Sequence, residues 1–268
     1  MSKVRVPARI GLLGNPSDGY GGRVIAATID DFAATVVAEP AATWDLVAPA
    51  RHFEARTTAD LSAALDLDGL DEGLQLMAAA TLRLDRHGPG LGPHRVLFES
   101  DIPRQAGLSG SSAVVIGVLR TLAPELDTLD IARLALEAEV DVLGWAAGPQ
   151  DRVVQAMGGL VDMRFDEPWD PSRYERLDPA RLPTCVLAWT DEPGEHSGQI
   201  HASVRDRWNA GERPVIDAMS RFAALAAEGR RSLDDGSAPE AWPGLAEEAF
   251  AAGGRSTGDD HSRPGLCR

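Results

Sequence analysis

The chain between residues 102 and 113 reads Ile-Pro-Arg-Gln-Ala-Gly-Leu-Ser-Gly-Ser-Ser-Ala and combines small and hydroxylated residues. Gly107 and Gly110 have no Cβ, so the backbone at these positions can approach a ligand closely. The helix expected after them offers unpaired N–H groups and the positive end of its macrodipole, which suit a phosphate. Serine hydroxyls in the same segment can bind phosphate or ligate Mg²⁺. The segment therefore predicts a phosphate-binding loop; it lacks the Lys of a Walker A loop, and an ordinary serine N-cap is the alternative.

Two carboxylates further along the chain could serve phosphoryl chemistry. Glu139 lies in a predicted helix over residues 129–143, and Asp151 follows a turn over residues 144–150 that can bring the two together. Phosphoryl transfer needs one carboxylate to hold Mg²⁺ and usually one to orient or deprotonate the attacking hydroxyl. Taken alone, such acids are more often a solvated helix face and a helix N-cap.

A turn-rich segment near the N-terminus, residues 14–22, reads Gly-Asn-Pro-Ser-Asp-Gly-Tyr-Gly-Gly. Asn15, Asp18 and Tyr20 offer donors and acceptors that suit a ligand rich in hydroxyl groups. Arg23, directly after the segment, can pair with a carboxylate. The segment is a candidate for substrate binding, and the alternative is a plain turn between two strands.

The loop over residues 102–113 resembles the second motif of the GHMP kinases, whose usual form is Pro, three variable residues, Gly-Leu, a small residue and Ser-Ser-Ala. Pro103 and the Gly-Leu pair match in place, and one extra small residue precedes the Ser-Ser-Ala. Alignment on the Gly-Leu pair makes Ser111 the Mg²⁺-ligating serine, which we prefer, whereas alignment on Ser-Ser-Ala makes it Ser112. The resemblance implies that the phosphates of ATP contact Pro103, Gly107, Leu108, Ser109, Gly110, Ser111 and Ser112.

The order of Glu139, then Gly-Pro-Gln-Asp-Arg at 148–152 and Gly-Gly-Leu at 158–160, also resembles GHMP sugar kinases. By that match Glu139 ligates Mg²⁺ together with Ser111, and Asp151 is the catalytic aspartate. Arg104 is added as a second candidate catalytic residue. Residues 9–23 resemble the first motif, which supplies substrate contacts, and the substrate-binding set is Asn15, Asp18, Tyr20, Arg23 and Arg152. ATP and Mg²⁺ are the implied cofactors.

The amino-acid sequences of three segments, 14–19, 102–112 and 150–155, resemble those of glucuronokinases more than those of galactokinases or mevalonate kinases. That family phosphorylates the anomeric hydroxyl of D-glucuronate to give glucuronate 1-phosphate. Arg23, Arg104 and Arg152 are the candidates for recognising the uronate carboxylate. The alternatives are a kinase for another sugar, of the galactose or heptose phosphate type, and a nucleotide- or sugar-binding homologue without turnover.

The elements expected around these motifs mix strands and helices without a clean βαβ repeat, which favours an α+β fold. We expect strands over residues 8–14, 95–99, 160–165 and 184–190. We also expect the runs over 24–29 and 32–37 to form either two strands or one bent strand. We expect helices within 58–84 and over 109–122, 129–143, 151–157, 198–209, 214–228 and 239–251. The resemblance implies an N-terminal lobe related to ribosomal protein S5 domain 2, residues 1–182, and a ferredoxin-like C-terminal lobe, residues 183–252.

The C-terminal part departs from the family pattern. GHMP kinases usually carry a third, glycine-rich motif near the C-terminus, and none is recognisable after residue 251. Only one clear strand, 184–190, follows the lobe boundary, so we expect an incomplete C-terminal lobe. The Gly253-Gly254 pair is interpreted as a helix C-cap, followed by a disordered tail over residues 253–268.

The composition of the chain limits the kinds of partner that it can bind. The 268 residues are 44% hydrophobic and 25% charged, as in folded globular proteins, and the net charge of −15 argues against nucleic-acid or anionic membrane surfaces as partners. Cys185 and Cys267 match neither a zinc spacing nor a disulfide framework, and no apolar export segment is visible. We expect a cytoplasmic monomer or homodimer whose partners are ATP and a small uronate sugar.

Overall fold

The computed structural model describes residues 1–67, 69–88, 90–189 and 197–257, which fall into two compact units. The first unit comprises Met1–Arg9 and Thr28–Gly158, and the second comprises Ile10–Ala27 with the described part of Gly159–Arg268. Each unit thus takes two separate stretches of chain, and neither ends at residue 182. The division into kinase lobes at that residue stays a prediction.

Two long N-terminal strands contribute to both units. They are β1 (Ser2–Leu13) and β2 (Arg23–Pro40), which pair with each other. The expected runs over 24–29 and 32–37 form one strand because Asp30 and Asp31, which separate them, are both exposed to solvent. Two acids whose side chains are exposed to water are compatible with extended backbone. The β-branched residues on either side therefore continue the same strand.

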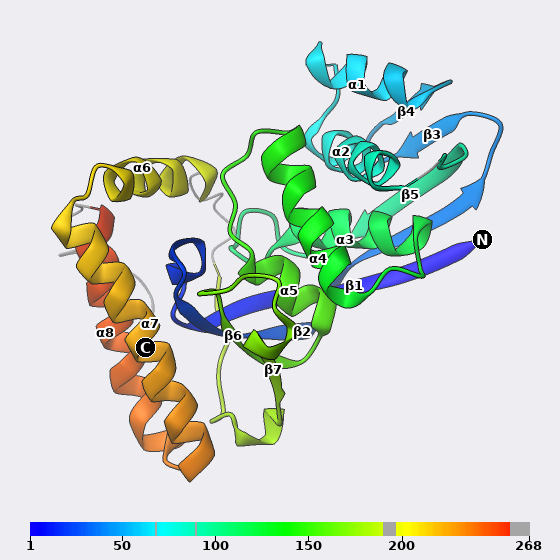
Figure 1. The fold of residues 1–268 in the computed structure, drawn as a ribbon. Coiled ribbons are helices and arrows are strands. Elements are labelled where there is room, and N and C mark those ends of the chain that lie inside the picture. Colours follow the sequence, from blue (N-terminus) through cyan, green and yellow to red (C-terminus); the bar gives the residue numbers. More distant parts are fainter. Residues whose placement is uncertain (68, 89, 190–196, 258–268) are drawn as a thin grey trace. The chain divides into compact units, whose positions relative to one another are not determined.

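In the first unit the strand order is β4-β3-β5-β2. The second half of β2 pairs antiparallel with β5 (His94–Ser100), β5 runs parallel to β3 (Trp44–Val47), and β3 pairs antiparallel with β4 (His52–Ala55). Strands β3 and β4 were not predicted, because four-residue strands are too short for a periodic signal. Helices accompany this sheet in Figure 1, with bounds α1 (Thr58–Asp66), α2 (Glu72–His87), α3 (Gly110–Leu122), α4 (Thr128–Glu137) and α5 (Gln150–Met157).

Helix α3 lies unusually close to the sheet. A Cβ added at Gly117 would lie 2.4 Å from Val36 Cγ2 on β2, so only glycine permits this distance. Residues 112–119 of α3 are all buried. Tight packing of this kind fixes the position of the N-terminal end of α3, where the phosphate loop enters the helix.

In the second unit the first half of β2 pairs antiparallel with β6 (Leu160–Arg164), and β6 pairs antiparallel with β7 (Tyr174–Leu177). Strand β7 was missed because the surrounding prolines suggested a loop. The helices of this unit are α6 (Ser197–Asn209), α7 (Arg213–Asp235) and α8 (Ala238–Thr257), of which α7 and α8 lie side by side in Figure 1. Within the described residues, none of these helices is both long and apolar enough to cross a membrane.

Two C-terminal predictions were wrong. Residues 184–189 have no regular secondary structure, and residue 190 lies outside the described residues, so the expected strand over 184–190 is absent where it can be examined. Gly253 and Gly254 lie inside α8 and do not cap it, because the helix continues to Thr257. The rest of the expected tail, residues 258–268, lies outside the described residues.

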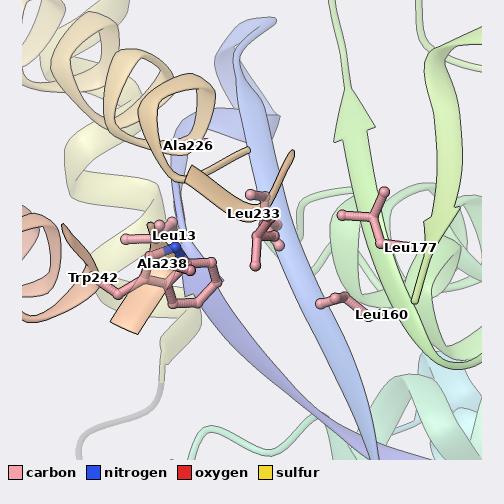
Figure 2. Close-up of a cluster of buried hydrophobic side chains, with 8 residues drawn as sticks. Leu13, Leu160, Leu177, Ala226, Leu233, Ala238 and Trp242 are labelled. Carbon is pink, nitrogen blue, oxygen red and sulfur yellow. The ribbon is translucent and has the colours of Figure 1, made fainter. Parts of the chain in front are cut away.

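A hydrophobic cluster joins the strands of the second unit to α7 and α8 (Figure 2). Its buried members are Leu13, Ile25, Leu160, Leu177, Ala226, Leu233, Ala238 and Trp242. Leu13 is tightly enclosed, since a Cβ at Gly229 would lie 2.2 Å from Leu13 Cδ1. The cluster therefore holds strand β1 against the helices.

Truncation of Leu13 to alanine is expected to lower the free energy of unfolding by about 2–5 kcal/mol, because it removes a buried side chain from a site that cannot collapse freely. Urea denaturation measures the change. Leu67→Ala is the matched control: Leu67 is 80% exposed, so its truncation should change stability by less than about 0.5 kcal/mol. Equal losses in the two variants would contradict a core role for Leu13.

Candidate active site

Ser109 lies at the turn from the phosphate loop into α3. Its backbone is left-handed, with φ 60° and ψ 49°, and the preceding Gly107 has φ 72°. A left-handed serine carries backbone strain, which is often found at functional sites. Its hydroxyl makes no capping bond to α3 and donates to Asp151 Oδ2 at 2.8 Å. The interpretation of this serine as an ordinary N-cap is therefore wrong. The side chain of Ser109 does not bind the first amides of the helix.

Asp151 lies in the first turn of α5, after the N-cap residue Pro149, so it is not an N-cap itself. Arg9 Nε donates to Asp151 Oδ1 at 2.6 Å, and Arg9 Nη1 donates to the carbonyl of Gly107 at 3.0 Å. Burial alone would raise the pKa of the Asp151 carboxyl, but the charges of Arg9 and Arg152 and the bonds from Arg9 and Ser109 outweigh it and lower this pKa. Asp151 is therefore an ionised carboxylate held in a fixed orientation.

Arg9 was not predicted as a site residue. One signal for it is present in the sequence: Arg9 is the one charged residue of the strand expected over residues 8–14 and directly precedes the Ile-Gly-Leu-Leu-Gly run. Its side chain is 12% exposed. A guanidinium that is mostly buried needs a partner carboxylate, and here the partner lies 142 residues further along the chain.

Glu139 lies in a π-helical turn, η2 (Ala138–Val142), which follows α4. Leu143 N–H donates to the carbonyl of Ala138, five residues earlier, so the expected α-helix over 129–143 changes form at this acid. Such π turns often mark functional sites. The Glu139 side chain is 3% exposed, which contradicts the solvated-face interpretation. Its widened turn directs the carboxylate into the unit, where it meets Arg152.

Few groups contact the buried carboxyl of Glu139. Arg152 Nη2 pairs with Glu139 Oε2, and Arg152 Nη1 lies 3.7 Å from Asp151 Oδ2, so one guanidinium bridges both acids. Burial raises the pKa of Glu139, while the charge of Arg152 and a hydrogen bond with Ser111 lower it in part. Among the described residues, Glu139 Oε1 has no hydrogen-bond partner. A buried carboxylate oxygen without a partner suits a cation.

The two candidate serines have different neighbours. Ser112 is fully buried and its hydroxyl donates to Gln155 Oε1 at 2.6 Å. Ser111 instead lies near Glu139, where its hydroxyl lowers the pKa of that carboxyl. Mg²⁺ prefers hard oxygen ligands, and the hydroxyl of Ser111 with the free oxygen of Glu139 provides two. The donor set fits this metal, with Ser111 favoured over Ser112.

The remaining predicted residues of the loop are placed as follows. Leu108 is buried, and its carbonyl accepts the backbone N–H of Arg9 at 3.2 Å. Gly110 begins α3, and Pro103 is half-buried before it. Arg104 is 87% exposed and lies 3.5 Å from Glu72, so the structure pairs it with that acid and places Arg9 against Asp151 instead.

The predicted substrate segment belongs to the second unit. A turn closed by Ser17 N–H to the Gly14 carbonyl, 2.8 Å, leads into the short 3₁₀ helix η1 (Ser17–Tyr20). Asp18 is buried, and the Tyr20 ring lies 4.7 Å from that of Trp208 on α6. The segment is thus an ordered loop anchored by an aromatic contact, which goes beyond a plain turn.

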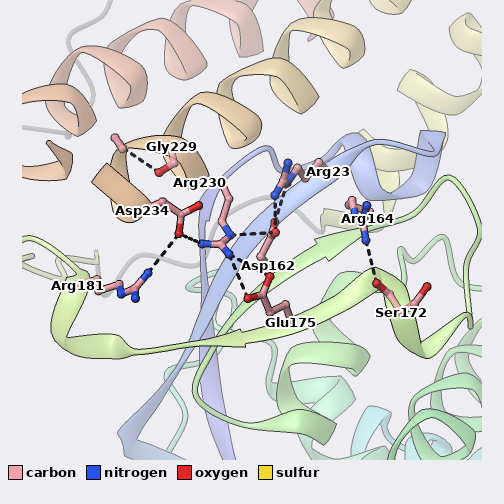
Figure 3. Close-up of polar contacts among 10 residues, drawn as sticks. Arg23, Asp162, Arg164, Ser172, Glu175, Arg181, Gly229, Arg230 and Asp234 are labelled. Atoms are coloured by element: carbon pink, nitrogen blue, oxygen red, sulfur yellow. Dashed lines mark hydrogen bonds and ion pairs between the residues drawn. The ribbon is translucent and has the colours of Figure 1, made fainter. Parts of the chain in front are cut away.

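Arg23 is committed to a buried carboxylate (Figure 3). Its Nε donates to Asp162 Oδ1 at 2.8 Å, and its Nη2 reaches Asp162 Oδ2 at 2.5 Å. Arg230 Nε lies 3.5 Å from the same Oδ2, and Arg230 Nη2 binds Glu175. A bidentate pair with a side chain that is 5% exposed satisfies the fork of Arg23. The proposed role of Arg23 in reading a substrate carboxylate loses its basis.

Comparison with known proteins places the chain. The family described as GHMP kinases N terminal domain matches residues 75–159. Glucuronokinase 1 of Arabidopsis thaliana is 37% identical over 247 residues, which cover 84% of this chain and 67% of that protein; probable glucuronokinase 2 of the same plant matches equally, over 66% of its length. The chain spans about two thirds of the length of each.

Among solved structures, Lactococcus lactis galactokinase complexed with galactose superimposes with a TM-score of 0.73 at 18% identity, covering 99% of this chain and 76% of that one. At such identity the likeness concerns the fold alone, and it confirms the expected α+β GHMP kinase fold. The chain belongs to the GHMP kinases, enzymes that use ATP. Its similarity to two glucuronokinases over most of its length places it among the sugar kinases of that family.

Proposed function

We propose that this sugar kinase transfers the γ-phosphoryl group of ATP to the anomeric hydroxyl of D-glucuronate and releases glucuronate 1-phosphate. The observation that carries the proposal is the Asp151 carboxylate, held ionised by Arg9 and Ser109 directly beside the N-terminal end of α3. The choice of sugar rests on the 37% identity with glucuronokinase 1 of Arabidopsis thaliana.

The residues of the first unit divide the chemistry among them. Backbone amides at the start of α3 bind the phosphates, since a helix N-terminus without a capping side chain offers free donors. Ser111 and Glu139 would hold Mg²⁺, which would offset the negative charge of the phosphates. Asp151 accepts a hydrogen bond from the sugar hydroxyl and takes its proton as the new P–O bond forms and the bond between the γ-phosphorus and the ADP oxygen breaks.

The lowered pKa of Asp151 bears on how it acts. A carboxylate with a low pKa is a weak base, so its main contribution is to orient the hydroxyl and to stabilise it as its proton leaves. Phosphoryl transfer passes through a loose transition state, in which positioning matters more than strong deprotonation. Arg9 keeps the carboxylate from rotating, because it binds both Asp151 and the Gly107 carbonyl.

The second unit supplies the proposed contacts to the sugar hydroxyls through Asn15, Asp18 and Tyr20. Their side chains offer an amide, a carboxylate and a phenol, which can accept and donate hydrogen bonds to a polyol. The carboxylate of the sugar requires a cation as well. Since Arg23 is paired with Asp162, that cation must be sought elsewhere.

A direct test is the release of ADP from Mg·ATP on adding D-glucuronate, with D-galactose and no sugar as controls. We expect turnover that depends on glucuronate and a product that carries the phosphate at the anomeric position. Preferred turnover of galactose would replace the proposed substrate. Absence of turnover with any sugar, in a sample shown to be folded and to bind ATP, would count against kinase activity in this chain.

A further inference from the structure

None of the three arginines expected to read the uronate carboxylate is well placed to do so. Arg23 forms the bidentate pair with Asp162. Arg152 is 4% exposed and bridges Glu139 and Asp151. Arg104 is 87% exposed and lies next to Glu72, where water competes for its donors. A cation beside the predicted sugar loop is therefore a better candidate for this contact.

Arg205, on α6, lies directly over the predicted sugar loop. Its guanidinium carbon is 4.2 Å from the centroid of the Tyr20 ring, within the range of a cation–π contact. Its Nη2 atom lies 2.8 Å from the position that a Cβ would take at Gly19, so the absence of a side chain there admits the guanidinium to the loop backbone. Both the loop and α6 belong to the second unit.

The arginine is held in place before any ligand binds. Trp208, one turn further along α6, packs on the same Tyr20 ring, and both aromatic residues lie against a buried cluster. The members of that cluster are Val204, Val215, Ala218, Met219, Phe222 and Ala252. A side chain whose orientation is already fixed loses little conformational entropy when it binds a ligand.

Stacking and carboxylate binding use different parts of a guanidinium. The contact with Tyr20 occupies the face of the planar group, whereas the N–H donors point outward in its plane. A carboxylate approaching in that plane can accept two parallel hydrogen bonds. The contact with Tyr20 therefore leaves Arg205 able to recognise an anion beside the residues proposed to bind the sugar hydroxyls.

We propose that Arg205 is a specificity-determining residue that binds the C6 carboxylate of a uronate substrate, stacked on Tyr20 and admitted by Gly19. The inference rests on the proposed function for its choice of sugar and on the loop over residues 14–22 as the sugar-binding segment. It assigns discrimination between a uronate and a neutral sugar to an interaction between α6 and the N-terminal loop.

The test compares D-glucuronate with D-glucose, which differ only in the carboxylate or hydroxymethyl group at C6. We expect Arg205→Met to lower kcat/KM for glucuronate by about 10- to 100-fold, chiefly through KM, because a charge-assisted hydrogen-bond pair is lost. The rate with glucose should stay the same. Arg207→Met is the matched control: Arg207 lies on the same helix and pairs with Glu212, so its removal should affect neither sugar.

Two further variants separate recognition from folding. Arg205→Lys keeps the charge but loses the planar fork, and should recover part of the glucuronate rate. Gly19→Ala keeps Arg205 but displaces its tip, and should weaken glucuronate selectively. Equal losses on both sugars in Arg205→Met would indicate a structural role and overturn the proposal, as would no loss at all.

The role of Arg205 can still be tested if the proposed kinase function is wrong. Should the wild-type chain turn over no glucuronate, calorimetric titration with glucuronate measures binding directly. Binding that weakens in Arg205→Met but persists in Arg207→Met would support the assignment of Arg205 without the kinase reaction. Equal affinity in the two variants, or no binding to the wild-type chain, would overturn it.

Discussion

Replacement of Asp151 by asparagine is expected to lower kcat by about 10²- to 10⁴-fold, the range found when a positioned acid or base is removed. Asparagine keeps the shape of the side chain and can still accept from Ser109, but it carries no charge to orient the attacking hydroxyl or to receive its proton. ATP affinity should persist, because the phosphate loop is unchanged. Steady-state kinetics with glucuronate and titration with ATP measure the two effects separately.

The control for this variant is Asp141→Asn, which removes an exposed carboxylate from the π-helical turn that also carries Glu139. It should leave kcat unchanged. Equal rates in Asp151→Asn and the wild-type chain would remove Asp151 from the mechanism. A loss of ATP binding in the same variant would assign it to nucleotide binding instead.

The pH dependence follows from the lowered pKa of Asp151. A carboxyl with a folded pKa below its unfolded value of about 3.9 contributes stability above that unfolded pKa, and the contribution is lost as pH falls through the folded pKa. Asp151 therefore stays ionised throughout the weakly acidic range. Any loss of activity between neutral pH and about pH 5 must arise from other groups, and this part of the profile should keep its shape in Asp151→Asn.

Arg152→Met is expected to reduce the free energy of unfolding by about 3–5 kcal/mol at pH 8, because it leaves the Glu139 carboxylate buried without its partner. The loss should shrink at low pH. Without Arg152, the folded pKa of Glu139 should rise further above the unfolded value. A carboxyl with a raised folded pKa destabilises the folded state as pH rises, because ionisation is then more costly in the folded than in the unfolded chain. Urea denaturation at pH 5 and pH 8 measures the difference.

Two comparisons decide whether the buried pair is the cause. The double variant Arg152→Met/Glu139→Gln removes both charges and should recover most of the stability lost at pH 8. Arg95→Met breaks a pair that is half exposed, with Asp45, and should cost no more than about 1 kcal/mol. A double variant as unstable as Arg152→Met alone would show that packing of the arginine stem, and not the charge on Glu139, is what matters.

Local sequence predicted most helices of this chain well. The helix after the phosphate loop was expected from residue 109 and begins at Gly110, and the helix expected over 214–228 is the core of α7. Both have apolar residues at helical spacing. Strands β3, β4 and β7 have four residues each and were missed, because a strand of that length is defined by its partners across the sheet.

The predicted phosphate loop could be proposed from sequence alone, because its amides, its hydroxyls and the following helix are neighbours along the chain. What sequence left open was which side chain meets which. The same sequence is compatible with serines that cap a helix, with acids that face solvent, and with an arginine that bridges two buried acids. Only the folded structure assigned the Ser109 hydroxyl to Asp151 and placed Ser111 near Glu139.

By itself, then, the sequence determined the family, and it predicted a phosphate loop and two acids that would serve it. Tertiary structure decided which arginines are available. Arg9 meets Asp151 across 142 positions, and Arg23 meets Asp162 across 139. An arginine side chain is long and flexible, and the free energy of its guanidinium depends on the carboxylate that folding brings to it. No local pattern distinguishes an arginine committed to a buried acid from one, such as Arg205, stacked on an aromatic ring with donors left for a ligand.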